Sequence, residues 1–163
     1  MRNAKISVGI TAYKNSEYLL EALNSLIDQS VDSWEGIFIL DKGADRKTKK
    51  IFNNFKHPRI LKHRCKYHKG AEQARHEAIK LSSTNWYFQL DSDDKIPPYA
   101  ISEILNKINE NPDAEFIYGP TMHFSKNSSY VMLPSDNPEV LTSSALFSAI
   151  MPIKIEMYFR IGG

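Results

Sequence analysis

Three acidic residues directly follow an apolar, aromatic run in the segment YFQLDSDDKIPP, residues 87–98. These are Asp91, Asp93 and Asp94. Asp91 and Asp93 are two residues apart, so in an extended or turn conformation their carboxylates can converge on one hard cation, or divide between a cation and ligand hydroxyls. Carboxylates this close repel one another, and a bound divalent ion relieves that repulsion. An oxygen-only cluster suits Mg²⁺ or Mn²⁺ better than zinc.

The same cluster has a second interpretation that involves no ligand. Asp and Asn are common in turns and at helix N-caps, so the cluster could form a turn, or Asp93 or Asp94 could cap a helix that begins near residue 97. A zinc site at His63, Cys65 and His68 is not favoured, because their spacing matches no zinc pattern and a fourth ligand is missing.

Basic residues gather in two segments, residues 42–50 and 62–69. Either group could face an anion, although charge runs usually belong to solvated faces. Nucleic-acid binding is not expected, because the formal net charge is only +2 and exposed aromatic residues are not interleaved with the cations.

Alternating strand and helix patterns must position these residues. Apolar runs predict strands at 5–13, 35–41, 58–64 and 85–91, and helical spacing predicts helices at 15–30, 45–55, 70–83 and 97–112. Two later strands, at 114–124 and 129–134, could pair. Continuous apolar strands that alternate with helices predict an α/β fold, a Rossmann-like, mostly parallel sheet with helices on both faces.

Ligands of such sheets bind beyond the carboxyl ends of the strands. Four segments follow predicted strands, at residues 11–14, 41–45, 66–70 and 91–95. Gly70 is expected to open a helix whose N-terminus favours an anion. A dinucleotide or Walker-type site is not expected, since no Gly-rich phosphate loop follows the first strand.

Three motifs carry a resemblance to a known family. SVGITAYKNSEYLLEALNSLIDQSVDSWEGIFILDKG, then KGAEQARHEAI, then WYFQLDSDD followed by IPP, resemble the N-terminal part of family 2 glycosyltransferases of the GT-A fold. The likeness extends over about residues 5–163, and the motifs keep the family's order and spacing. The resemblance implies a nucleotide-sugar donor, Mn²⁺ or Mg²⁺, and inverting transfer to a glycan, lipid or protein acceptor.

The resemblance also implies individual site residues. Asp91-Ser92-Asp93 matches the family's D-x-D, which binds metal and the diphosphate or ribose, and Asp41 matches the first acidic residue of the usual DDGS. The nucleotide-sugar site is therefore expected at Thr11, Ala12, Tyr13, Asp41, Lys42, Gly70, Asp91, Ser92 and Asp93. The metal site is expected at Asp93, Asp91 and Asp94.

Two departures from the family pattern stand out. Lys42 replaces a second Asp that often accepts a hydrogen bond from uracil, and Lys cannot accept one, although it could meet a phosphate or a base carbonyl. The final stretch MPIKIEMYFRIGG resembles the segment just before the family's catalytic base. The base is therefore expected beyond Gly163, and the chain is expected to be a domain at residues 1–163 cut before that segment.

Several further expectations depend on that end. The chain alone is expected to bind donor but transfer little sugar, and a catalytically silent donor-binding module remains the alternative. Apolar residues at Ile150, Ile153, Ile155 and Phe159 are expected to favour self-association or a frayed C-terminus. No long apolar span or signal peptide is present, and Cys65 is the single cysteine, so a cytoplasmic location is expected, including a peripheral position on the inner face of the membrane.

Overall fold

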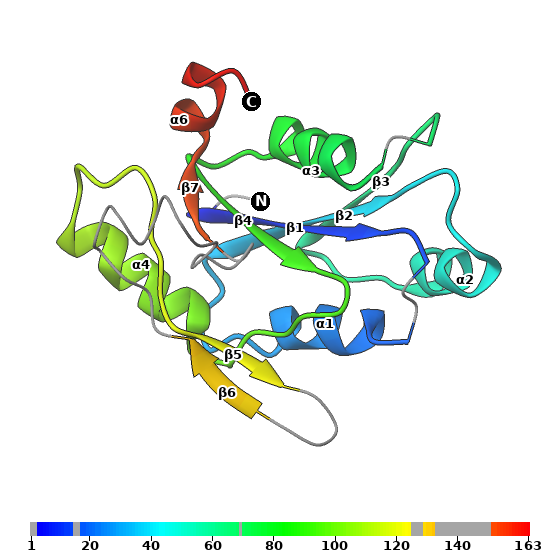
Figure 1. Ribbon diagram of the computed structural model, residues 1–163, viewed down its shortest axis with the longest axis horizontal. Coiled ribbons are helices and arrows are strands. Elements are labelled where there is room, and N and C mark those ends of the chain that lie inside the picture. Colours follow the sequence, from blue (N-terminus) through cyan, green and yellow to red (C-terminus); the bar gives the residue numbers. More distant parts are fainter. Residues whose placement is uncertain (1–2, 15–16, 69, 125–128, 133–150) are drawn as a thin grey trace.

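A five-stranded sheet organises the computed structural model, which describes residues 3–14, 17–68, 70–124, 129–132 and 151–163 (Figure 1). The strands are β1 (Ile6–Ala12), β2 (Trp34–Leu40), β3 (Ile60–Arg64), β4 (Trp86–Asp91) and β7 (Ile153–Lys154). Their order across the sheet is β3-β2-β1-β4-β7. The first four are parallel, and β7 runs antiparallel to β4. The prediction of an α/β fold with a mostly parallel sheet is confirmed.

Helices cover both faces of this sheet. The helices α1 (Leu19–Ile27), α2 (Arg46–Asn54) and α4 (Ala100–Glu110) lie on one face. On the opposite face lie α3 (Gly70–Leu81) and the short α6 (Ile155–Arg160). The predicted helices on both faces are therefore confirmed, and they explain why the strands are apolar throughout instead of alternating.

The larger core lies between the sheet and α1, α2 and α4. Every residue of β2 is buried, and from β4 Phe88 and Leu90 point into this core with no exposed surface. Leu19, Leu23 and Leu26 of α1 pack against them at helical spacing. This layer fixes β4, the strand whose end carries the acidic cluster.

The C-terminal part of the described chain differs from the predicted pattern. The strand predicted at 114–124 is only β5 (Thr121–Phe124), since Gly119 and Pro120 interrupt it, and β5 pairs with β6 (Ser129–Met132) as an antiparallel ribbon. Residues 115–117 instead run beside β7, where Phe116 bridges to Ile153. Neither β7 nor α6 was predicted.

The apolar C-terminal residues are only partly accessible. Ile153 and Ile155 pack against the core beneath α3, whereas Phe159 is exposed. Ile150 lies outside the described residues. The predicted self-association through these four side chains stays a prediction.

A buried carboxylate ties the amino ends of the strands together. Glu35 on β2 is 4% exposed and accepts hydrogen bonds from the Ser7 hydroxyl at 2.7 Å, the Ser83 hydroxyl at 2.6 Å and the Ser83 amide at 2.7 Å. Burial by itself raises the pKa of the Glu35 carboxyl, but these hydrogen bonds outweigh it, and the pKa lies below its ordinary value of 4.5. The ionised form is thus the one that the fold stabilises.

We expect Glu35→Gln to lower the free energy of unfolding at pH 7 by about 1–3 kcal/mol, because an amide NH₂ would face donors in place of an acceptor oxygen. A lowered folded pKa means that the stabilisation is complete above the unfolded pKa and is lost as the pH falls through the folded pKa. The difference between wild type and variant should therefore shrink on acidification below about pH 4.5, measured by urea unfolding. Glu103→Gln, at an exposed site on α4, is the control; an equal loss in both variants would contradict the role of Glu35.

Candidate active site

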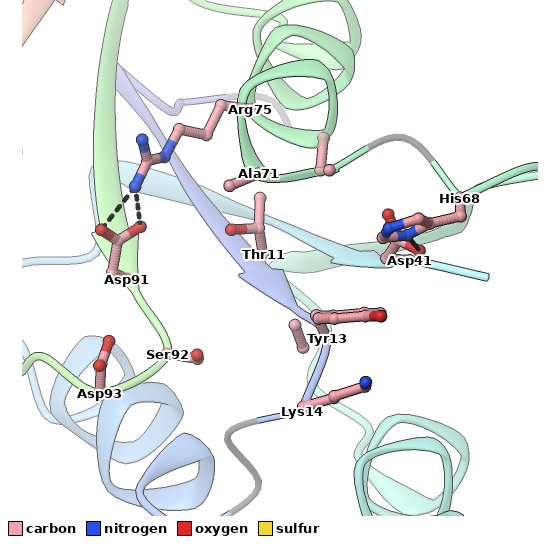
Figure 2. A pocket seen from close by; sticks show the side chains of 13 residues that line it. Thr11, Tyr13, Lys14, Asp41, His68, Ala71, Arg75, Asp91, Ser92 and Asp93 are labelled. Carbon is pink, nitrogen blue, oxygen red and sulfur yellow. Dashed lines mark hydrogen bonds and ion pairs between the residues drawn. The ribbon is translucent and has the colours of Figure 1, made fainter. Parts of the chain in front are cut away.

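A cavity opens where the carboxyl ends of β1, β2 and β4 meet the N-terminus of α3. Its volume is about 440 Å³. Figure 2 shows Asp91 and Asp93 on one side of it, His68 and Asp41 on the other, and Thr11 and Ala71 between them. The residues that line it are Thr11, Ala12, Tyr13, Lys14, Asp41, His68, Gly70, Ala71, Ala74, Arg75, Asp91, Ser92 and Asp93.

The strand ends meet here because parallel strands bring their carboxyl ends to one edge of the sheet. Of the residues predicted from the sequence, the structure brings together all except Lys42 and Asp94. Gly70 opens α3 with a φ of 76°, a left-handed conformation that glycine adopts without steric cost. The amides of the first turn of α3 thus lie beside the cavity.

Asp91 is held by two partners. Its carboxylate oxygens lie 2.7 and 3.0 Å from one guanidinium nitrogen of Arg75 (Figure 2). The side-chain amide of Gln89 donates to Asp91 Oδ1 at 3.0 Å. Burial lowers the pKa of Arg75, but the hydrogen bond and charge of Asp91 raise it above its ordinary value, so this cation stays charged.

Gln89 is itself fixed by a tyrosine on the same face of β4. The Tyr87 hydroxyl donates to Gln89 Oε1 at 2.5 Å, and both side chains are buried. Gly9, paired with Gln89 across β1 and β4, leaves the space that this hydroxyl occupies, because a Cβ there would lie 1.9 Å from Tyr87 Oη. Tyr87, Gln89 and Asp91 therefore form a chain of hydrogen bonds along the strand.

Asp93 and Asp94 lie in the turn that follows β4. The Asp94 amide donates to the Asp91 carbonyl at 3.1 Å, and Asp93 is exposed. The pKa of Asp94 is raised, first by burial and then by the charges of Asp91 and Asp93. Of the ligand-free alternatives, the turn is present at residues 92–93, whereas a helix cap by Asp93 or Asp94 is wrong, because Tyr99 precedes α4 with no side-chain cap bond.

The loop after this turn is anchored on α1. Ser25 Oγ accepts from the Ile96 amide at 3.3 Å, and the Gln29 side chain donates to the Pro97 carbonyl at 2.7 Å and accepts from the Ile101 amide at 2.9 Å. These bonds hold both ends of the segment in place. The turn that carries Asp93 therefore lies between the end of β4 and this anchored segment.

The acidic residues at the cavity fit a metal ion that is coordinated by protein carboxylates together with phosphate oxygens of a ligand. No group of three His, Cys, Asp or Glu side chains able to hold a metal is found within the described part of the chain. Asp91 is already bonded to Arg75, while the exposed Asp93 carboxylate lines the cavity. Mg²⁺ is typically bound by one or two carboxylates together with substrate phosphates, which suits Asp93.

The opposite side of the cavity is built around Asp41. This residue is 3% exposed, and its Oδ1 lies 2.9 Å from the Gly43 amide and 2.7 Å from His68 Nδ1. The His68 ring stacks on Tyr13 with centroids 4.9 Å apart, and Lys14 Nζ lies 4.9 Å from the Tyr13 centroid. The aromatic ring, the imidazole and the carboxylate form a planar, polar wall that suits a nucleobase or ribose.

Lys42 lies away from this wall. It is exposed, does not line the cavity, and its ammonium lies 5.7 Å from the Tyr67 ring centroid. Sequence reasoning did not assign Lys14, His68, Ala71 and Ala74 to the donor site, although Lys14 and His68 lie in two of the four segments that follow predicted strands. The structure also argues against a zinc site at His63, Cys65 and His68. His63 Nε2 lies 3.8 Å from a carboxylate oxygen of Glu77, Cys65 is buried, and His68 is hydrogen-bonded to Asp41.

Comparison with known proteins decides the family. The model described as Glycosyl transferase family 2 matches residues 7–157. The chain belongs to this family. An uncharacterized glycosyltransferase of Haemophilus influenzae is 26% identical over 166 residues, covering 97% of this chain and 55% of that protein. An Escherichia coli enzyme, UDP-Glc:alpha-D-GlcNAc-diphosphoundecaprenol beta-1,3-glucosyltransferase WfaP, is 29% identical over 126 residues, which are 77% of this chain and 46% of that enzyme.

The solved structure of Staphylococcus aureus TarS 1-349 in complex with UDP-GlcNAc has a similar fold. It superposes with a TM-score of 0.76 at 18% identity, covering 96% of this chain and 47% of that one. The predicted GT-A fold is thereby confirmed. The chain spans about half the length of these relatives.

If the cavity binds UDP together with Mn²⁺, we expect Gln89→Met to weaken that binding by about 10-fold, because Met fills the same space but neither donates to Asp91 nor accepts from Tyr87. Calorimetric titration with UDP and Mn²⁺ measures the change. Gln73→Met, at an exposed site on α3, is the matched control. If Gln89→Met only lowered the melting temperature and left UDP affinity intact, Gln89 would be a packing residue without a role in positioning Asp91.

Proposed function

We propose that this family 2 domain binds a nucleotide-diphosphate sugar with Mn²⁺ or Mg²⁺ and transfers the sugar, with inversion, to an acceptor hydroxyl. The observation that carries the proposal is one cavity that joins the acidic turn at Asp93 to the wall of Tyr13, His68 and Asp41. The two sides match the two ends of such a donor, a diphosphate and a nucleoside. UDP-GlcNAc occupies the similar structure of TarS, which supports a UDP-sugar as donor.

In this proposal the nucleoside lies against Tyr13, with Asp41 as the acceptor for base or ribose hydrogens. The diphosphate lies between Asp93 and the N-terminal amides of α3, where a helix terminus favours negative charge. A bound divalent ion supplies charge neutralisation for the departing diphosphate. Arg75, bonded to Asp91, holds that carboxylate in a fixed orientation at the cavity.

The reaction is a single displacement. The acceptor oxygen forms a bond to the anomeric carbon from the side opposite the diphosphate, the carbon–oxygen bond to the diphosphate breaks with its electron pair, and the acceptor proton passes to a general base. The prediction that this base lies beyond Gly163 stays a prediction. Proton NMR of the product's anomeric configuration tests inversion.

The acceptor and the location belong to the same proposal. WfaP is named for a diphosphoundecaprenol-linked acceptor, which supports a lipid-linked glycan as acceptor here. None of the helices among the described residues has the length and apolar character that crossing a bilayer requires. We propose a cytoplasmic domain that works peripherally at the inner face of the membrane.

Calorimetric titration with UDP, GDP, CDP and dTDP tests the donor class. UDP is expected to bind in the presence of Mn²⁺ and to lose affinity with a chelator, because phosphates and carboxylates repel without an intervening cation. Since Lys42 lies outside the cavity, Lys42→Ala should change UDP affinity by less than about 2-fold and leave the base preference intact. Loss of that preference in Lys42→Ala would show that the lysine reaches the base, and equal binding with chelator would exclude the metal.

A further inference from the structure

The charges of this chain are strongly segregated. Residues 42–69 hold eleven of its 21 lysines and arginines but only one of its 19 acidic residues. This stretch therefore carries a formal charge of +10, while the rest of the chain carries −8, although the total is only +2. The stretch comprises α2, the edge strand β3 and their flanking loops.

The exposed face of α2 is entirely basic or polar. Thr48 and Phe52 form its buried face, and Arg46, Lys47 and Lys50 are exposed on the opposite side. The helix contains no acidic residue, and its cations form no salt bridge with a described residue. Asp45, the single acidic residue of the stretch, is committed to the Thr48 amide at the helix N-cap.

The cations of β3 extend this surface. Lys62 Nζ and the Arg64 guanidinium lie 4.7 and 5.0 Å from the centroid of Phe52, which places both on the α2 side of the sheet. Burial, and then the charges of Arg64 and Lys56, lower the pKa of Lys62, as expected where cations gather without counter-ions. We call the basic face the surface formed by Arg46, Lys47, Lys50, Lys56, Lys62 and Arg64.

Protection of a sheet edge explains only part of this surface. Lysines on an edge strand discourage pairing with other chains, which accounts for Lys62 on β3. The cations of α2 lie on a helix and protect no edge. Their mutual repulsion is a cost that a bound anionic surface would offset.

We propose that the basic face docks on a membrane surface rich in acidic phospholipids. Each lysine or arginine near such a surface contributes to binding, so a cluster of this size suffices for peripheral association. Tyr67, 70% exposed beside Lys42, is the kind of side chain that settles at a membrane–water interface. The proposal rests on the peripheral location in the proposed function and names the surface responsible for it, a surface separate from the donor cavity, because none of the basic face lines that cavity.

A membrane fits this face better than a nucleic acid. Nucleic-acid sites for single strands combine a basic groove with several stacking aromatics. The cavities at Asp91 and at Tyr158 are lined by no residue of α2 or β3, and Tyr67 is the one exposed aromatic among described residues 42–68. A broad basic face without a groove or several stacking aromatics matches the flat surface of an anionic membrane.

Docking in this way would bring the donor site to the membrane. Asp41 lines the cavity, and the chain runs from it through Lys42 directly to Asp45, the N-cap of α2. The N-terminus of α2 thus lies near the carboxyl ends of β1 and β2 (Figure 1), and residues at those strand ends line the cavity. A lipid-attached acceptor in that membrane would lie close to the bound donor.

Vesicle co-sedimentation tests the proposal with phosphatidylcholine vesicles and with vesicles that also contain phosphatidylglycerol. We expect binding only to the acidic vesicles and release by high salt. The triple variant Arg46→Glu, Lys47→Glu, Lys50→Glu should lose at least about 100-fold in vesicle affinity, at roughly 5-fold for each cation removed. UDP titration of the same variant shows whether it is folded and keeps the donor site, so failure of docking is distinguishable from failure of donor binding.

The matched control reverses three exposed lysines elsewhere, Lys5→Glu, Lys80→Glu and Lys107→Glu, with the same change in net charge. It should retain most of the vesicle affinity. Equal losses in both triple variants, or equal binding to neutral and acidic vesicles, would overturn the proposal. Tighter binding to a single-stranded oligonucleotide than to acidic vesicles would overturn it in favour of a nucleic acid.

Discussion

Asp93→Asn is expected to weaken UDP binding in the presence of Mn²⁺ by at least about 100-fold, which corresponds to about 3 kcal/mol. Asp93 is the exposed carboxylate of the acidic turn, and it lines the cavity while Asp91 is held by Arg75. An amide of the same shape keeps the turn but lacks the charge that would hold a divalent ion beside a diphosphate. Calorimetric titration with and without chelator measures the effect.

The control for this substitution is Asp113→Asn, an isosteric change at an exposed site after α4. It should leave UDP affinity unchanged. Thermal unfolding of both variants without ligand should match wild type closely, because each carboxylate is exposed. Equal UDP affinity for wild type and Asp93→Asn, both with metal and with chelator, would mean that the acidic turn holds no metal-bound diphosphate.

Phe88→Ala is expected to lower the free energy of unfolding by about 3–5 kcal/mol, the largest stability effect we anticipate. The Phe88 side chain is 0% exposed and points from β4 into the core beneath α1 and α4. Its removal leaves a cavity in a layer that cannot collapse freely, because β4 is bonded on both sides, to β1 and to β7. Urea unfolding gives the change as a shift in midpoint at constant slope.

Phe116→Ala provides a matched comparison, since this ring is 43% exposed. Its loss should cost less than about 1 kcal/mol. Phe88→Ala should also reduce UDP affinity at temperatures where the variant is still folded, because Asp91 and the acidic turn extend from the same strand. Similar stability losses for the two variants would contradict the assignment of Phe88 to the main core.

The sequence alone determined the layers of the fold. Continuous apolar strands that alternate with helical spacing require a sheet covered on both faces, and the order of elements then puts residues 11–14, 41–45 and 91–95 at one edge. These patterns are local and repeat over five or more residues, so they survive without knowledge of the neighbours. The strand β7 has only two residues, too few to show a strand pattern in the sequence, and it was not predicted.

Residue types and the predicted strand ends likewise placed the acidic turn and Tyr13 at the ligand-binding edge of the sheet. The family resemblance then assigned individual residues there to the donor and metal sites. What each carboxylate contacts was not accessible. Whether Asp91 pairs with Arg75, 16 residues away, or Asp41 with His68, 27 residues away, depends on the register of the strands and the rotation of α3. Neither quantity is encoded in a local pattern.

Tertiary structure also decided which cations lie together and which residues leave the site. Lys42 follows Asp41 in sequence, yet its side chain turns toward Tyr67 while the Asp41 carboxylate faces the cavity. Lys62 and Arg64 join the cations of α2 only because β3 is the edge strand and both side chains fall over Phe52. The direction of a side chain is set by the local backbone and by packing against residues distant in the sequence. The sequence therefore revealed two basic segments, but only the structure showed that their cations form a single basic face.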